Sequence, residues 1–264
     1  MRIPFTKAHG ARNDFLLTWE GDAPANGREA AARSICARHT GVGADGWILV
    51  TPSTEPGVQG AIQLYNSDGS TAELSGNGTR CAAAFLIRHG YQEQSLQIRT
   101  GAGIKRLKLL HRSGLNFEFE MNMGRPEIAA ARFELPLCAG PRDVTLLWVG
   151  NPQCAVPVEN FDFDWQSMGA EIAGHAHFPN GTNVSFIRPL DEHSIEARFY
   201  ERGAGVTMSS GTGSTGAAAS AAARGWVTSP VRVLTPAGPL VLRLEEDAHL
   251  TGPAEIVAEG EFLL

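Results

Sequence analysis

The chain has few of the residues on which many metalloenzymes, secreted proteins and cofactor-dependent enzymes rely. Its 264 residues include four cysteines without a CxxC pair, so neither a zinc site nor a disulfide framework is predicted. The only lysines, Lys7, Lys105 and Lys108, lie in no context that suggests a Schiff base with pyridoxal phosphate. We therefore expect no metal and no cofactor.

Long apolar runs and clusters of positive charge are also missing. No run approaches the ~20 apolar residues that cross a bilayer, and charged residues interrupt the N-terminal segment where a signal peptide would need an apolar stretch. The formal net charge of -6 argues against nucleic acid or an anionic membrane as the partner. We expect a cytoplasmic protein that binds a small molecule, and we leave open whether it forms a homodimer.

Short alternating runs separated by Gly, Pro and Asn dominate the chain and predict strands. The clearest strand candidates are Ala61–Asn66, Ile104–Leu110, Leu115–Met121 and Ser194–Tyr200. The helical candidates are fewer, namely Glu29–Arg38, Asn77–His89, Asp164–Ala173 and Gly211–Arg224. Because strands and helices do not alternate regularly, we predict an α+β fold rather than a parallel α/β sheet.

One segment occurs twice. The stretch AELSGNGTRCAAAF that begins at Ala72 returns as MSSGTGSTGAAAS from Met208, and Ser210 lies 135 positions after Ser75. Each copy has a strand ending in Tyr, a loop, Ser-Gly-x-Gly and an alanine-rich helix. Two copies at this distance predict two similar lobes related by a pseudo-two-fold axis, with the two loops facing each other across a cleft.

Each repeated loop opens a predicted helix. Glycines at a helix N-terminus let backbone N–H groups approach a ligand, and these groups together with the helix dipole form an anion site. Two such loops would hold a carboxylate from both sides. The alternative is that Ser75 and Ser210 only cap their helices, since serine is among the preferred N-cap residues.

Other motif matches are weak. GVGADG (Gly41–Gly46) fits the spacing of a dinucleotide-binding loop, but it follows a predicted helix and precedes a predicted strand, which is the reverse of the required order. The sequence has no G-x-S-x-G or S-x-x-K motif of a serine hydrolase. HAH (His175–His177) lacks companion ligands at a usable spacing and predicts a polar loop.

Six segments together resemble the signature blocks of the diaminopimelate epimerase family, in the family's order and over nearly the whole chain. They are FTKAHGARNDF from Phe5, ARHTGVGADG from Ala37, LYNSDGSTAELSGNGTRCAA from Leu64, GNPQC from Gly150, FPNGTNVSF from Phe178 and YERGAGVTMSSGTGSTGAA from Tyr200. The resemblance implies two pseudo-symmetric lobes, each a mainly antiparallel sheet wrapped around a central helix, with the active site between them. We place the N-terminal lobe at 1–113, with a strand near 252–264 returning to it, and the C-terminal lobe at 114–251.

The resemblance also implies a cofactor-independent reaction with two bases. One base takes the α-proton from one face of an amino acid, and an acid on the opposite face returns a proton, which inverts LL- to meso-diaminopimelate in lysine and cell-wall biosynthesis. The two helix N-termini would hold the α-carboxylate and stabilise the developing negative charge. In the family both bases are cysteines; the matching positions here are Ser75 and Ser210.

The two serines change the expected chemistry. A thiol ionises near pKa ~8.5 and a hydroxyl near the ~15.7 of water, a gap of about seven pKa units or about 10 kcal/mol, whereas a helix terminus supplies at most ~2 kcal/mol. Gln153 also stands where the family usually has His, and it cannot take a proton. The sequence therefore predicts that the family mechanism, run through two hydroxyls, loses most of its rate.

The positions that would hold the substrate do match the family. The resemblance assigns the distal carboxylate to Asn66, Asn183 and Arg202, and the distal ammonium to Glu201 with Asn66. Arg pairs with a carboxylate and Glu with an ammonium, which suits a second amino-acid head group. The full set of expected binding residues is Asn13, Asn66, Gly76, Asn77, Asn151, Asn183, Glu201, Arg202, Gly211 and Thr212.

Three functions remain open at this point. The first is an epimerase of diaminopimelate or a close analogue, with Ser75, Ser210 and Glu201 as the catalytic candidates. The second is an isomerase or dehydratase of the same fold in which a carboxylate, Glu201, Asp68 or Asp45, moves the proton. The third is an amino-acid-binding protein without turnover.

Overall fold

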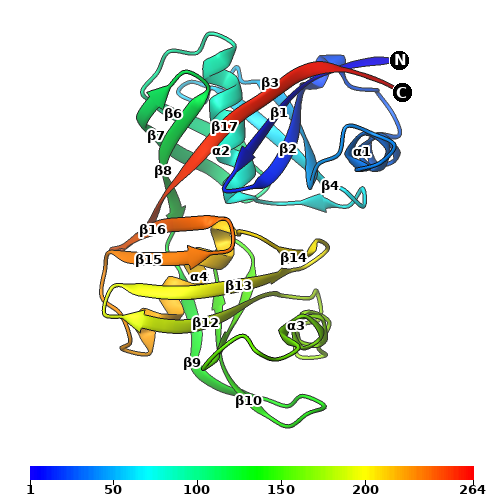
Figure 1. The fold of residues 1–264 in the computed structure, drawn as a ribbon. Coiled ribbons are helices and arrows are strands. Elements are labelled where there is room, and N and C mark those ends of the chain that lie inside the picture. Colours follow the sequence, from blue (N-terminus) through cyan, green and yellow to red (C-terminus); the bar gives the residue numbers. More distant parts are fainter. The chain divides into compact units, whose positions relative to one another are not determined.

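The computed structural model describes residues 1–264, and the chain forms two compact units. The first consists of Met1–Met121 together with Gly252–Leu264, and the second of Asn122–Thr251. Strands β8 (Asn116–Gly124) and β17 (Ala248–Leu263) each run from one unit into the other. Both chain ends belong to the first unit, where Arg2 pairs with Leu263 in adjacent strands (Figure 1).

The first unit is a mixed sheet with two helices. Neighbouring strands pair in the order β17, β1, β2, β3, β4, β6, β7, β8. In this order β2–β3 and β4–β6 are parallel pairs and the other pairs are antiparallel. Because β8 also pairs with β17, the sheet closes like a barrel. Its further elements are β1 (Arg2–Gly10), β2 (Asn13–Trp19), a 3-10 turn (Glu20–Asp22), α1 (Arg28–Cys36), β3 (Gly46–Pro52), β4 (Gly60–Asn66), β5 (Thr71–Ala72), α2 (Gly76–Arg88), β6 (Ser95–Thr100) and β7 (Gly103–Ser113).

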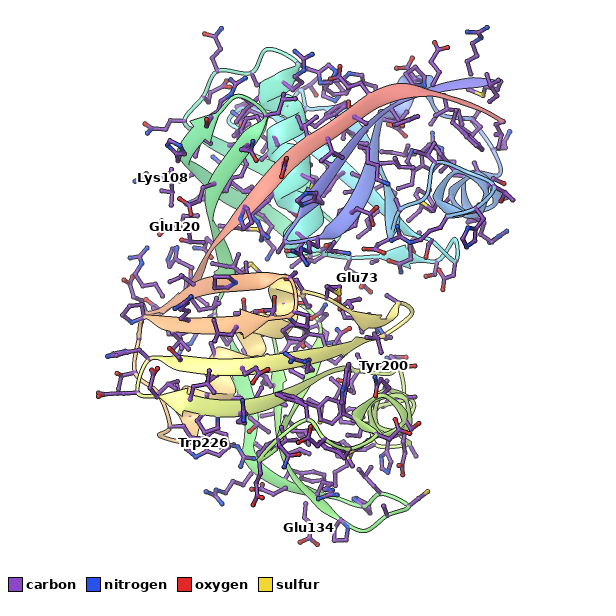
Figure 2. All side chains as sticks on the ribbon, viewed as in Figure 1. Glu73, Lys108, Glu120, Glu134, Tyr200 and Trp226 are labelled. Atoms are coloured by element: carbon purple, nitrogen blue, oxygen red, sulfur yellow. The ribbon has the colours of Figure 1, made fainter.

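Helix α2 is the core of this unit. Every residue from Gly76 to Ile87 is buried, and the helix contacts β1, β2, β3, β4, β6 and β7. A helix that is buried on all sides has no solvent face, so it lies inside the sheet rather than on it. The exposed Lys108 of β7 and the half-buried Glu120 of β8 carry opposite charges and are directly opposite in register (Figure 2).

The second unit has the same sequence of pairings. Its strands pair in the order β9, β10, β11, β12, β13, β15, β16, β17, again with two parallel pairs, β11–β12 and β13–β15. Helix α4 is buried from Gly211 to Ala221 and contacts every one of these strands from β9 to β16. The elements are β9 (Glu127–Leu135), β10 (Arg142–Trp148), β11 (Pro152–Pro157), α3 (Trp165–Ala173), β12 (Asn183–Asp191), β13 (Ser194–Glu201), β14 (Gly205–Thr207), α4 (Gly211–Ala223), β15 (Val231–Thr235) and β16 (Gly238–Leu244).

The elements expected from the sequence are confirmed. The four predicted helices occur as α1, α2, α3 and α4, each within two residues of the expected ends. Three of the four strand candidates lie within β4, β7 and β13, and Leu115–Met121 begins one residue before β8. The segment Gly41–Gly46 joins α1 to β3, in the order that excludes a dinucleotide-binding loop. No helix is long and apolar enough to span a membrane.

Candidate active site

Ser75 begins helix α2. Its backbone is extended (φ -129°, ψ 119°), and its Oγ accepts a hydrogen bond from the Gly78 N–H at 3.0 Å. A Cβ on Gly78 would lie 3.0 Å from the Ile48 side chain and 3.3 Å from Ser75 Oγ, so a larger residue would crowd the loop at its cap. Ser75 therefore caps α2, which fits both the ligand-binding interpretation and the alternative of a cap alone.

Ser210 begins helix α4 in the same way but has an additional partner. Its Oγ accepts from the Gly213 N–H at 3.0 Å and donates to Glu201 Oε2 at 2.9 Å. The other carboxylate oxygen of Glu201 accepts from Thr207 Oγ1 at 2.6 Å. Ser210 is thus a buried hydroxyl held against a carboxylate, whereas no carboxylate bonds to the Ser75 hydroxyl.

In the first unit the structure joins two of the three expected asparagines. Asn77 Nδ2 donates to Asn13 Oδ1 at 3.2 Å, and Asn13 Nδ2 donates to Asp45 Oδ2 at 2.8 Å. Asn66 instead bonds within its own turn, where its Nδ2 donates to Ser70 Oγ at 2.9 Å. Asn77 and Asn13 are buried, so their hydrogen bonds fix both amides in one orientation.

A charged cluster behind these amides was not foreseen from the sequence. Arg38 Nη2 bonds Asp14 Oδ1 at 2.9 Å and Asp45 Oδ1 at 2.6 Å, and Lys7 Nζ lies 3.1 Å from Asp14 Oδ2. Burial opposes ionisation of Asp14, but hydrogen bonds from Arg38 and Lys7 outweigh it and hold its pKa below the ordinary value. Burial raises the pKa of Asp45. All four residues fall within two of the family-like blocks, but their pairing depends on how distant segments fold together.

In the second unit three of the expected residues form one network with Gln153 around β11 and β12. Asn183 Oδ1 accepts from the Arg202 backbone N–H at 3.0 Å, and Asn183 Nδ2 donates to the Pro152 carbonyl at 3.2 Å. Gln153 Nε2 donates to Asn151 Oδ1 at 2.6 Å, and Gln153 pairs with Asn183 across the two strands. Tyr200, which precedes Glu201 in the sequence, lies beside helix α3 (Figure 2).

Gln153 leaves one polar atom unsatisfied. Its side chain is buried, and Gln153 Oε1 has no hydrogen-bond partner. A Cβ on Gly216 of helix α4 would lie 3.4 Å from Gln153 Cγ, so the side chain lies against that helix. A buried acceptor without a donor is unfavourable by about 1–3 kcal/mol, which a bound N–H donor would relieve.

The natural cysteines do not supply a thiolate. Burial raises the pKa of Cys36, Cys81 and Cys154 to about 12 in each case. Cys138 is exposed, and its hydrogen bond with Glu171 raises its pKa as well. No group of three or more His, Cys, Asp or Glu side chains is placed to hold a metal ion.

These features support binding and proton transfer. Gly76 and Gly211 are the first residues of their helices, where backbone N–H groups lack an intrahelical acceptor and favour an anion. The group best placed to accept a proton beside either serine is Glu201, through its bond with Ser210. The arrangement therefore suits an anionic ligand whose reaction moves a proton.

Comparison with known proteins gives one family. The family model described as diaminopimelate epimerase matches residues 5–129 and 145–257. Proteins named diaminopimelate epimerase from Archaeoglobus fulgidus and Pelotomaculum thermopropionicum are 38% and 36% identical to this chain, cover 98% of it, and are themselves covered over 96% and 98% of their lengths. A crystal structure of a hydroxyproline epimerase from Agrobacterium vitis, with bound trans-4-OH-L-proline, shares the fold with a TM-score of 0.76 at 15% identity, covering 98% of this chain and 90% of that one.

Proposed function

Because the chain belongs to the diaminopimelate epimerase family, we propose that it acts as an amino-acid epimerase on LL-diaminopimelate or a close analogue, without a cofactor. The observation that carries this proposal is the pair of serine-capped, glycine-rich helix N-termini within a full-length family match. The product would be meso-diaminopimelate, used in lysine and cell-wall biosynthesis. A cytoplasmic location stays a prediction.

We further propose that the two units are structural repeats of each other, as the repeated loop suggests. Their strands pair in the same order, with parallel pairs at β2–β3 and β4–β6 in the first unit and at β11–β12 and β13–β15 in the second, which supports this. Under this proposal each unit presents one helix N-terminus to the same substrate, as the sequence predicts for two similar lobes.

The proposed roles follow the chemistry of each group. The α-carboxylate binds the N–H groups of Gly76, Asn77, Gly211 and Thr212, and Ser75 and Ser210 flank the α-carbon. The distal carboxylate binds Arg202 with Asn66 and Asn183, and the distal ammonium binds Glu201 with Asn66. Asn13 and Asn151 complete the polar surface.

One observation favours a second candidate, in which a carboxylate moves the proton. Glu201 bonds the Ser210 hydroxyl, whereas Asp68 accepts bonds from Ser70 in its own turn and Asp45 is bonded to Asn13. Of the three carboxylates considered from the sequence, Glu201 alone contacts a serine at a proposed base position. It is the acceptor we favour for this chain.

Proton exchange separates these possibilities. LL-diaminopimelate incubated with the protein in deuterated water should lose its α-proton signal in the NMR spectrum, and meso-diaminopimelate should accumulate more slowly. Exchange without inversion would assign a single working base. Thermal stabilisation by diaminopimelate without any exchange would leave an amino-acid-binding protein and would refute the proposed turnover.

Arg202 gives a direct test of the distal group. Replacing Arg202 by Ala should weaken diaminopimelate binding by at least about tenfold, because a charged hydrogen bond to the second carboxylate is lost. L-Norleucine has one head group and an apolar tail, so its affinity should change by less than about threefold. Calorimetry on both ligands gives the comparison. The matched control is Arg125→Ala, an exposed arginine of the same unit, and equal losses for both ligands would show that Arg202 does not bind the distal carboxylate.

A further inference from the structure

Arg80 is a fully buried arginine whose partners are all neutral. Its Nε donates to the Pro253 carbonyl at 3.0 Å, its Nη1 to the Gly76 carbonyl at 3.3 Å and its Nη2 to Asn77 Oδ1 at 2.5 Å. Burial lowers the pKa of Arg80 to about 10, so it keeps its charge near neutral pH. A buried cation without an anionic partner is unfavourable in a stable core, which points to a role beyond packing.

The position of this charge is set by helix geometry. Arg80 lies four residues after Gly76, so its side chain runs back along the first turn of α2 toward the loop that contains Ser75. A Cβ on Gly10 would lie 3.2 Å from Arg80 Nη2 and 3.2 Å from Asn77 Cβ. The main chain of β1 therefore covers the contact between the guanidinium and the asparagine.

Arg80 also begins a directed chain of hydrogen bonds. It donates to Asn77 Oδ1, which turns Asn77 Nδ2 toward Asn13 Oδ1, and Asn13 Nδ2 in turn donates to Asp45. A cation at one end and a carboxylate at the other leave each amide one favourable orientation. The two asparagines between them are both proposed substrate-binding residues.

The other helix lacks this cation. At the matching position of α4 stands Thr215, whose Oγ1 donates to the Gly211 carbonyl at 2.8 Å, in the place where Arg80 bonds the Gly76 carbonyl. At the start of α4 the capping Ser210 instead bonds the carboxylate of Glu201. The two helix N-termini therefore differ in electrostatic character although their sequences repeat.

We propose that Arg80 is a positioning residue that orients Asn77 and Asn13 and makes the N-terminus of α2 the stronger of the two helix N-termini in selecting the anionic head group. This role rests on the proposed binding of an amino acid by the α2 loop. It requires no contact between Arg80 and the substrate, because the charge acts through the first turn of the helix and through the fixed amides.

The test compares L-norleucine with L-norleucinamide, which differ in the charge of the carboxyl group. Ligand-detected NMR gives both dissociation constants. In the wild-type protein we expect norleucine to bind at least about tenfold more tightly than norleucinamide. Arg80→Gln should reduce the ratio of the two dissociation constants by about tenfold. Arg80→Lys, which keeps the charge but not the forked geometry, should preserve most of the ratio while both affinities fall.

Two further variants isolate the charge from the packing. Asp45→Asn removes the carboxylate end of the chain at a half-buried position, so it should weaken both ligands by the same factor. Thr215→Val, the matched control in α4, should leave the ratio of the two dissociation constants unchanged. If Arg80→Gln does not fold, Arg80→Lys gives the test. A ratio of the two dissociation constants near one in Arg80→Lys would contradict a role for the charge.

The outcomes also separate this inference from the proposed function. If wild-type protein binds neither norleucine nor diaminopimelate, the proposed substrate class is wrong. If the ligands bind but the ratio of their dissociation constants is the same in wild type and Arg80→Gln, Arg80 has only a structural role and this inference alone is overturned.

Discussion

A variant with both Ser75→Cys and Ser210→Cys should epimerise LL-diaminopimelate at least about a hundredfold faster than the wild-type protein. Ionising a serine hydroxyl costs about 10 kcal/mol more than ionising a thiol, and a helix N-terminus stabilises the anion by at most ~2 kcal/mol. A thiol at the same helix terminus can instead reach a pKa between ~3.5 and ~7.5. The reaction would then use the two thiols as alternating base and acid.

The natural cysteines should interfere little with detection of the introduced thiols. Three of the natural cysteines are buried with a pKa raised to about 12, and Cys138 alone is exposed. In a Cys138→Ser background, alkylation by iodoacetamide should therefore report on the introduced thiols, and its pH dependence gives their pKa. Diaminopimelate should protect both from alkylation.

Stability should move in the opposite direction from activity. Each serine Oγ accepts a hydrogen bond from the third residue of its helix, Gly78 or Gly213. Sulfur is a weaker acceptor, so each exchange should lower the free energy of unfolding by about 1 kcal/mol, as for other lost N-caps. The double Ala variant is the matched control: it loses both caps and should gain no activity.

Two results would refine or refute this account. Adding Gln153→His should raise the rate further, because the side chain lies against α4 and an imidazole can take a proton from the thiol at its N-terminus. A wild-type protein already as fast as the double Cys variant would mean that proton transfer does not depend on the groups at positions 75 and 210.

The sequence was sufficient to predict the elements that carry the two serines. Ser-Gly-x-Gly followed by alanine is both a cap signal and a buried-helix signal, and its repetition gave two independent indications of the same structure. These are local properties, so α2 and α4 begin where expected.

Arg80 and the charged cluster at Asp14 and Asp45 could not be predicted in the same way. A charged residue in a helix is usually exposed, and Arg80 stands out only because it is the single charged residue from Gly76 to Ile87. That run without another charge was an available signal for a buried guanidinium. The pairing of Asp45 with Asn13 depends on the parallel register of β2 and β3, which no local pattern specifies.

Replacing Glu201 by Gln should reduce α-proton exchange in the wild-type protein by about a hundredfold to ten-thousandfold, the usual contribution of a general base. Glu201 Oε2 is 2.9 Å from Ser210 Oγ, and Thr207 Oγ1 holds the other oxygen at 2.6 Å. The carboxylate can take the α-proton itself or through the Ser210 hydroxyl. Gln has the same shape and cannot accept the proton.

Glu201 is also proposed to bind the distal ammonium, so rate and affinity must be measured separately. Calorimetry with diaminopimelate gives the dissociation constant, and exchange in deuterated water at saturating ligand gives the rate. Thr207→Val removes one hydrogen bond but leaves the carboxylate in place. It should slow exchange by less than about tenfold, and Thr207→Ser should restore it.

The double Cys background separates the two roles of Glu201. If the carboxylate is the base of the wild-type protein, Glu201→Gln should abolish most of the exchange in the wild-type background. In the double Cys background the loss should be far smaller, because the thiols at positions 75 and 210 then transfer the proton. Its effect on the dissociation constant should be equal in the two backgrounds, since the ammonium contact is unchanged. Wild-type exchange should also favour one stereoisomer, because Ser75 has no comparable carboxylate and only one face of the α-carbon meets a base. Equal losses of rate in both backgrounds, with exchange from both stereoisomers, would leave Glu201 as a binding residue alone.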